Sequence, residues 1–227
     1  MAFPASHDGH VCITGIGGNA SVTSIVPAHE SPLAALAVDY AGNLLATASE
    51  KGTLIRVFDI KSGRLLCELR RGTDRAEIFS VEFSRDGSKL CVASDKGTVH
   101  VFSLDGPTNA ANPNAVSPNA AFVAEYGPVH DEGQNKHSRY YYSTTILSFS
   151  LFFMKDLLPK YFSSQWSFAQ CKVGEQKCVA TFGQDPSTVL VASVDGSFYR
   201  FRFDPAKGGD CTRESLVKFT NIGSDQD

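Results

Sequence analysis

Two adjacent arginines, Arg70 and Arg71, are the residues of this 227-residue chain best suited to bind a phosphate group. A guanidinium group presents a planar fork of donors that holds phosphate oxygens in a bidentate way. Both arginines stand at the end of a predicted strand, where successive side chains point to opposite faces. One pocket cannot take both side chains if the strand stays regular, so the sequence predicts two anion sites.

Each arginine has companions whose hydroxyl, ammonium or imidazole groups can satisfy further phosphate oxygens. The first predicted site consists of His29, Ser49, Lys51, Thr53, Arg56 and Arg70. The second predicted site consists of Arg71, Thr73, Ser94, Lys96, Thr98 and His100. The serines and threonines are also typical turn residues, and each of them could serve only its turn.

The companions recur because the sequence repeats. Residues 36–53 resemble residues 81–98, with corresponding glycines 45 residues apart, and a third copy covers residues 178–201. Aligning the Val-Phe pairs of the first two copies places His100 opposite Arg56, with a slip of one residue. The repeat therefore supplies the same kinds of polar group twice.

The third copy differs at one informative position. It has Asp195 where the first two copies have Lys51 and Lys96, and a carboxylate there would repel phosphate. A turn that needs only its glycine would be indifferent to this change of sign. We therefore expect the two lysines to act in binding.

The elements that must position these residues are short β-branched or aromatic runs separated by Gly, Asp and Ser turns, a pattern typical of antiparallel strands joined by tight hairpins. The first copy predicts strands near 33–39, 44–49, 54–60 and 64–70. Four strands every 40–45 residues indicate an all-β fold, a partial β-propeller of WD-repeat type with about three and a half to four blades. We expect a blade remnant at 1–30 and blades at 31–72, 76–174 and 175–220, with a long insertion at 105–160.

Composition excludes several classes of protein. With 42% hydrophobic residues and a formal charge of −3, the chain is neither collagen-like, nor a coiled coil, nor a strongly basic nucleic-acid binder. No G-x-S-x-G, H-E-x-x-H or P-loop motif occurs, so we expect no enzyme, no metal and no cofactor. The six scattered cysteines and the lack of a signal peptide predict reduced thiols in a cytoplasmic protein.

Within the insertion, residues 140–154 form an uncharged, aromatic stretch that is too short to span a bilayer as a helix. It could dip into a membrane interface, form a buried strand, or be translated from sequence not normally spliced into the mature message. For the first alternative, the membrane-inserting side chains would be Ile146, Leu147, Phe149, Leu151, Phe152 and Phe153.

Three blocks of sequence, in this order, carry a resemblance to a known family. They are Val26-Pro27-Ala28-His29-Glu30-Ser31-Pro32, then Leu69-Arg70-Arg71-Gly72 with the flanking repeats, then residues 158–168. In these blocks the chain resembles the PROPPIN (WIPI) family of seven-bladed autophagy propellers. Its Met1 resembles the middle of that propeller, so we expect about three N-terminal blades to be missing.

The resemblance implies a function. It implies binding of phosphatidylinositol 3-phosphate and 3,5-bisphosphate, with the long loop as a membrane anchor. It also implies a peripheral membrane adaptor that works with autophagy-machinery proteins at the phagophore assembly site and on autophagosomal and endosomal membranes. Open propeller edges would permit self-association. A lipid-independent protein scaffold and a truncated product without lipid binding remain the alternatives.

Overall fold

The computed structural model describes residues 1–15, 23–104 and 164–219, and these residues form strands and turns without an α-helix. The 16 strands are β1 (Ala2–Pro4), β2 (His10–Thr14), β3 (Thr23–Pro27), β4 (Leu33–Val38), β5 (Leu44–Ser49), β6 (Leu54–Asp59), β7 (Leu65–Arg70), β8 (Ile78–Phe83), β9 (Lys89–Ser94), β10 (Thr98–Ser103), β11 (Gln165–Trp166), β12 (Ala169–Lys172), β13 (Cys178–Phe182), β14 (Thr188–Ser193), β15 (Ser197–Asp204) and β16 (Gly208–Lys218). Within the described ranges, no helix is long and apolar enough to cross a membrane.

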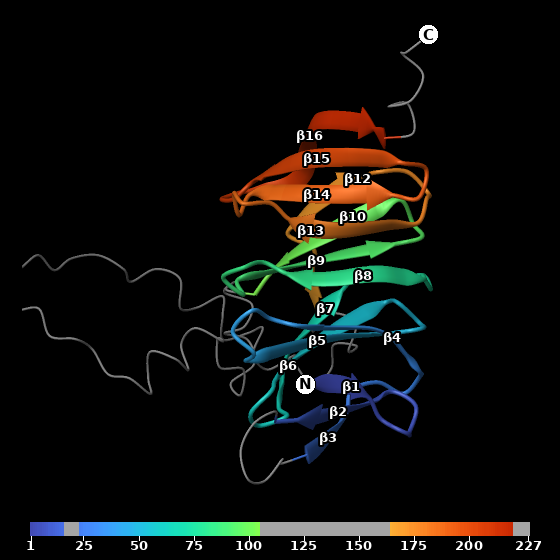
Figure 1. The fold of residues 1–227 in the computed structure, drawn as a ribbon, viewed down its shortest axis with the longest axis vertical. Coiled ribbons are helices and arrows are strands. Elements are labelled where there is room, and N and C mark those ends of the chain that lie inside the picture. The colour runs from blue at the N-terminus through green and yellow to red at the C-terminus, as the bar shows by residue number, and fades with distance from the viewer. Residues whose placement is uncertain (16–22, 105–163, 220–227) are drawn as a thin grey trace, which may run out of the picture.

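The strands form three sheets that stack along the long axis of the molecule, from β1–β3 at the bottom to β13–β16 at the top (Figure 1). The middle sheet is an antiparallel meander, β4 to β7, to which β11 adds a parallel edge on β7. The eight-stranded sheet consists of two meanders, β8-β9-β10-β12 and β13-β14-β15-β16, joined by a short parallel contact between β12 and β16. The all-β fold and the partial β-propeller are therefore confirmed, and so are the four strands expected between residues 33 and 70.

Three apolar seams hold the layers together. The first seam, between β1–β3 and β4–β7, contains Val11, Ile13, Val26, Ala28, Leu45 and Phe58. The second seam, between β4–β7 and β8–β12, contains Ala46, Ala48, Ile55, Val57, Leu69, Val81, Leu90, Val92 and Phe102. The third seam, between β8–β12 and β13–β16, contains Cys91, Ala93, Val99, Val101, Cys171, Val189, Val191 and Phe201. Alternate residues of β5 and β9 thus enter opposite seams, as the pleat of a strand requires.

Equivalent positions in successive layers can be assigned from strand register. Arg56 of β6 pairs with Thr47 and Glu68 on its two neighbours. His100 of β10 pairs with Val92 and Gln170 in the same way. The turn from β5 to β6 has one residue more than the turn from β9 to β10. The alignment of Arg56 with His100 and the slip of one residue are therefore confirmed.

The glycines of the hairpin turns yield a first prediction. Gly52 has a φ of +63°, and a Cβ atom at this residue would lie 1.9 Å from the carbonyl oxygen of Ala76. Gly42 has a similar φ of +76°, but a Cβ atom would meet nothing within 4 Å. Gly42→Ala should therefore cost about 1 kcal/mol of unfolding free energy through the left-handed backbone alone. Gly52→Ala should cost about 3 kcal/mol or more, because the backbone of Ala76 must also move.

Urea unfolding of the two variants beside the wild type measures this difference. The Gly42→Ala variant is the matched control for backbone conformation. Equal losses in the two variants would contradict the close packing of the β5–β6 turn against Ala76.

Candidate functional site

The first seam carries a row of hydrogen-bonded polar side chains around Arg56. Its Nη1 donates to the carbonyl oxygen of Ala28 at 2.6 Å, while Nε and Nη2 donate to Glu68 Oε2 at 3.0 and 2.9 Å. His29, in the connection after β3, lies 2.8 Å from Thr47 Oγ1 through its Nε2. These bonds fix the guanidinium fork of Arg56 on protein groups, so Arg56 orients its neighbours in the seam.

Arg70 joins this row from the end of β7. Glu68 and Arg70 lie two residues apart on one strand and therefore share a face. Ser164 links them, since its hydroxyl donates to Glu68 Oε1 at 2.9 Å and accepts from Arg70 Nη2 at 3.3 Å. Ser164 directly precedes β11, which pairs with β7, so a segment distant in sequence helps to position Arg70.

Arg71 enters the second seam because it continues the face of Leu69. The Arg71 side chain is only 6% exposed. Its Nε donates to the carbonyl oxygen of Gly52 at 2.9 Å, and its Nη2 donates to the carbonyl oxygen of Asp74. Burial lowers the pKa of Arg71, and the nearby carboxylates of Asp95 and Asp74 offset part of that effect. The two arginines thus serve two different seams, as strand alternation predicts.

His100 faces Arg71 across the second seam. The imidazole is 8% exposed and lies over the ring of Phe102, with 6.2 Å between ring centroids. Burial and the positive charge of Arg71 lower the pKa of His100 to about 4. Its Nδ1 has no hydrogen-bond partner in the described part of the chain. Buried polar atoms without a partner are rare, so this nitrogen is an unsatisfied polar group within the second seam.

The residues around Arg56 and Arg70 form the first cluster, and Arg71 and His100 form the second. The remaining predicted residues occupy the turns beside these two clusters. Ser49 and Ser94 are buried at the ends of β5 and β9. Lys51 and Lys96 are more exposed, at 3.5 Å from Glu30 and 3.4 Å from Asp95.

The three threonines differ in exposure. Thr73 is exposed at the rim, and its hydroxyl donates to Asp74 at 3.4 Å, whereas Thr53 and Thr98 are half-buried. The carbonyl oxygen of Thr53 accepts from the backbone N–H of Arg71 at 3.0 Å. The turn of Lys51 and Thr53 therefore borders the second cluster as well as the first.

Three polar residues of the first seam were not in the predicted sites: Thr47, Glu68 and Ser164. The register of the β6–β7 hairpin could have indicated Glu68, because it lies directly opposite Arg56. Alternation along β5 could have indicated Thr47, two residues before Ser49. Nothing in the sequence indicates Ser164, which meets Arg70 only through tertiary structure. The predicted membrane-inserting residues, from Ile146 to Phe153, lie outside the described residues.

In the described part of the chain, the third seam has no arginine or histidine at the positions that correspond to Arg71 and His100. The backbone N–H of Val173 donates to the β9–β10 turn as that of Arg71 does to the β5–β6 turn. Tyr199 occupies the register position of His100. Asp195 accepts from the backbone and hydroxyl of Ser197 at 3.0 and 2.9 Å, which serves its own turn and lowers its pKa. Among the described residues, a buried arginine or histidine is thus found in the first and second seams.

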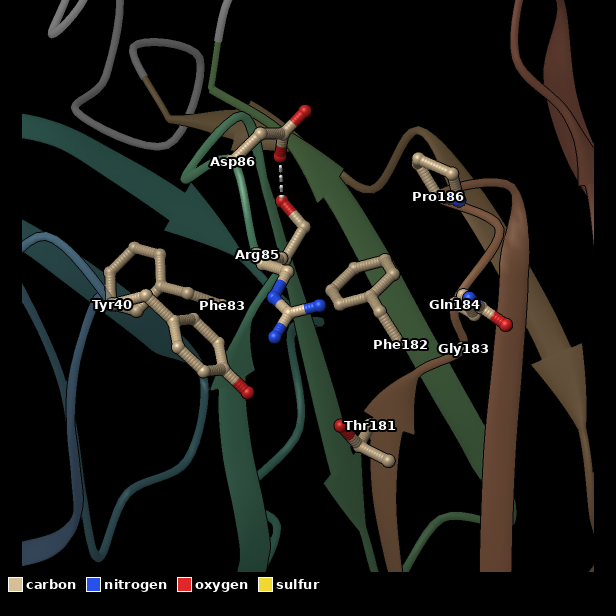
Figure 2. Close-up of a pocket in the computed structure, with 10 residues that line it drawn as sticks. Tyr40, Phe83, Arg85, Asp86, Thr181, Phe182, Gly183, Gln184 and Pro186 are labelled. Carbon is tan, nitrogen blue, oxygen red and sulfur yellow. Dashed lines mark hydrogen bonds between the residues drawn. The ribbon is translucent and has the colours of Figure 1, made fainter.

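A separate hollow of about 610 Å³ lies at the opposite end of β9, where the β8–β9 and β13–β14 turns meet Tyr40. Figure 2 shows the guanidinium of Arg85 between the rings of Tyr40 and Phe182. Among the described residues, Arg85 has no ion pair, and the neighbouring Asp86 carboxylate accepts hydrogen bonds from Ser84 and Ser88. The hollow therefore offers one positive charge between aromatic surfaces.

The buried histidines yield a second prediction. His29, beside Arg56, also has a pKa lowered to about 4, chiefly by burial. An unfolded histidine has a pKa near 6.5, so between pH 6.5 and 4 the unfolded chain binds more protons than the folded chain. Stability is therefore lost as the pH falls through this window. From pH 7 to pH 5, each histidine should contribute up to about 2 kcal/mol of that loss.

Urea unfolding at pH 7 and pH 5 tests this for the wild type, His29→Gln and His100→Gln. Each variant should lose less stability between the two pH values than the wild type does. Comparing the pH-dependent loss cancels any constant cost of the substitution. A loss of the same size in all three proteins would show that neither histidine is held neutral by the fold.

Comparison with known proteins shows which family the chain belongs to. Autophagy-related protein 18e of Arabidopsis thaliana is 36% identical over 211 residues, which are 92% of this chain and 46% of that protein. WD repeat domain phosphoinositide-interacting protein 2 of Gallus gallus is 34% identical over 200 residues, 86% of this chain and 41% of its own length. The chain thus spans about half the length of these curated relatives or less.

A solved structure of Hsv2 from Kluyveromyces lactis superposes with a TM-score of 0.63 at 24% identity, covering 92% of this chain and 56% of that one. This likeness supports the fold. The model of the PROPPIN family matches residues 1–220, which include both arginine clusters and all three seams. The chain is a member of the PROPPIN family.

Proposed function

We propose that this chain binds phosphoinositide head groups in its first and second seams and acts as a peripheral membrane adaptor in autophagosome formation. The observation that carries the proposal is the pair formed by buried Arg71 and His100 in the second seam. An arginine is costly to bury unless anionic or strongly polar partners surround it. A phosphate would accept from the Arg71 fork and from a ring N–H of His100, which has an unpartnered nitrogen.

The first seam supplies the second head-group site. His29 and Arg70 meet there on a frame of Arg56, Glu68 and Ser164. A single head-group site attaches a protein weakly to a membrane. Two linked sites act together through effective concentration when both reach the same bilayer. The first and second seams are adjacent, and Arg70 and Arg71 place one arginine in each. We therefore propose that both head-group sites reach the same bilayer.

The ligands proposed are phosphatidylinositol 3-phosphate and 3,5-bisphosphate. The phosphoinositide class is supported by the name of the Gallus gallus relative, and the autophagy role by the name of the Arabidopsis thaliana relative. On the same basis we propose autophagy-machinery proteins as partners, recruitment from the cytoplasm to phagophore, autophagosomal and endosomal membranes, and no catalytic activity. Each four-stranded layer is then one propeller blade, and open blade edges are a route to self-association.

Vesicle co-sedimentation with the full chain yields a third prediction. Vesicles of phosphatidylcholine with phosphatidylinositol 3-phosphate should bind the wild type. Arg70→Ala and Arg71→Ala should each weaken binding about 10- to 100-fold, the cost of losing a charge-assisted hydrogen-bond donor. Arg200→Ala is the matched control, because Arg200 pairs with Glu214 in the β13–β16 layer and its loss removes the same charge.

Arg71→Lys keeps the charge without the guanidinium fork, so its binding should be intermediate between those of the wild type and Arg71→Ala. Thermal melts show which variants fold. Wild-type binding no stronger than to vesicles with unphosphorylated phosphatidylinositol would overturn lipid recognition. Equal losses for Arg70→Ala, Arg71→Ala and Arg200→Ala would overturn the two specific sites in favour of general charge attraction.

The hollow of Figure 2 favours a second function, protein docking. A partner segment with a carboxylate beside an aromatic or aliphatic side chain would complement Arg85 between Tyr40 and Phe182. This hollow and the arginine clusters lie at opposite ends of β9, so lipid and partner would not compete for one surface.

Selection of peptides from a random phage library on the immobilised chain yields a fourth prediction. Enriched peptides should carry Asp or Glu next to an apolar residue, and Arg85→Ala should weaken their binding at least about tenfold. The same variant should bind phosphatidylinositol 3-phosphate vesicles as the wild type does. No enrichment, or peptides that bind Arg85→Ala equally well, would exclude the hollow as a docking site.

A further inference from the structure

Two cysteine side chains meet where the outer strands of two layers join. Cys171 lies on β12 and Cys211 on β16, and their Sγ atoms are 2.9 Å apart. The contact follows from register, because Ala169 pairs with Gly209 and Gln170 with Asp210 in this parallel pair. Both thiols are free, as are the other four cysteines of the chain. Among these six described cysteines, this pair forms the one thiol–thiol hydrogen bond.

The geometry of neighbouring strands suits a disulfide. Paired strands lie about 4.8 Å apart, within the usual span between the Cα atoms of bridged cysteines. The sulfur atoms at 2.9 Å need to approach to about 2.05 Å to bond. A shift of this size requires side-chain rotation and little backbone movement.

The two thiols are not equivalent. Cys171 is buried, whereas Cys211 is half-exposed. Cys171 donates its S–H to Cys211 Sγ, which lowers the pKa of Cys211 and raises the pKa of Cys171. A thiolate is the reactive form of cysteine toward oxidants. Oxidants in the solvent therefore reach Cys211, and Cys171 lies where its sulfur can attack the oxidised Cys211 sulfur.

We propose that Cys171 and Cys211 form a redox modification site whose oxidant is a peroxide. The Cys211 thiol releases its proton to solvent and the thiolate attacks a peroxide oxygen, so that an S–O bond forms and the O–O bond breaks. With hydrogen peroxide, the departing hydroxide takes up a proton from solvent and leaves as water. The Cys171 thiol then attacks the sulfur of this sulfenic acid, the S–S bond forms and a second water leaves. In total, two thiols lose two electrons and two protons, and one hydrogen peroxide is reduced to two waters.

The bridge would strengthen the shortest connection in the eight-stranded sheet. The outer edges of its two meanders are joined by two residue pairs, by the bond from the Gly209 N–H to the Phe168 carbonyl oxygen, and by the Lys172–Asp210 ion pair at 3.0 Å. A disulfide between residues 40 apart in sequence restricts the unfolded chain and closes this edge covalently. Oxidation would thus lock the layer that carries His100 to the layer that follows it.

The test uses the reduced full chain treated with hydrogen peroxide and then blocked with an alkylating reagent. Peptide mapping should recover one peptide pair linked through Cys171 and Cys211, with four of the six thiols still free. Dithiothreitol should reverse the change. The melting temperature should rise by about 5–10 °C on oxidation.

Cys211→Ser should abolish both the linked pair and the rise in melting temperature. Cys178→Ser is the matched control, because it removes a buried cysteine that does not contact another thiol, and should retain both. Linkage of other cysteines, irreversible oxidation of Cys211 without a bridge, or a bridge with an unchanged melting temperature would overturn the proposal. Because mapping of the wild type needs no variant and no lipid, its outcome is independent of the phosphoinositide function.

Discussion

The alternation of side chains along a strand is the constraint on which this structure depends. Each of the two inner layers has a seam on both of its faces, so strands such as β5 and β9 contribute alternate residues to two cores. On β5, Leu45 enters the first seam while Ala46 enters the second. Where β7 ends, the same rule sends Arg70 to the first seam and Arg71 to the second. Two neighbouring residues can therefore supply an arginine to each of two polar clusters without any change in backbone path.

The clusters place polar groups at the edges of apolar seams, and this location determines their chemistry. His29 and His100 are neutral near pH 7 because burial and a nearby arginine disfavour the protonated ring. Carbonyl oxygens and the nearby carboxylates of Asp95 and Asp74 stabilise the guanidinium group of Arg71, and the Ser164 hydroxyl accepts a hydrogen bond from Arg70. Desolvation strengthens the attraction of such groups for a phosphate. The third seam, with Val173 and Tyr199 at the matching positions, has a similar backbone and lacks this chemistry.

The junction of β12 with β16 depends on the same layered arrangement. β11 extends the middle sheet, while β12, three residues later along the chain, completes the next layer. The segment that contributes Ser164 to the Arg70 cluster therefore also leads into the edge that brings Cys171 to Cys211. The Arg70 cluster and the thiol pair share this connection, although they lie in different seams.

The sequence by itself determined the all-β repeat, the hairpin strands from residue 33 to 70 and the separation of Arg70 from Arg71, because these follow from local periodicity and turn residues. It also aligned His100 with Arg56, since the Val-Phe pairs fix strand register. Tertiary structure alone decided that Arg56 is held by Ala28, that Ser164 meets Arg70, and that Cys171 touches Cys211. Two of these contacts join residues 94 and 40 positions apart. No local pattern encodes such pairs, because they arise only when separate layers stack and their edges come into register.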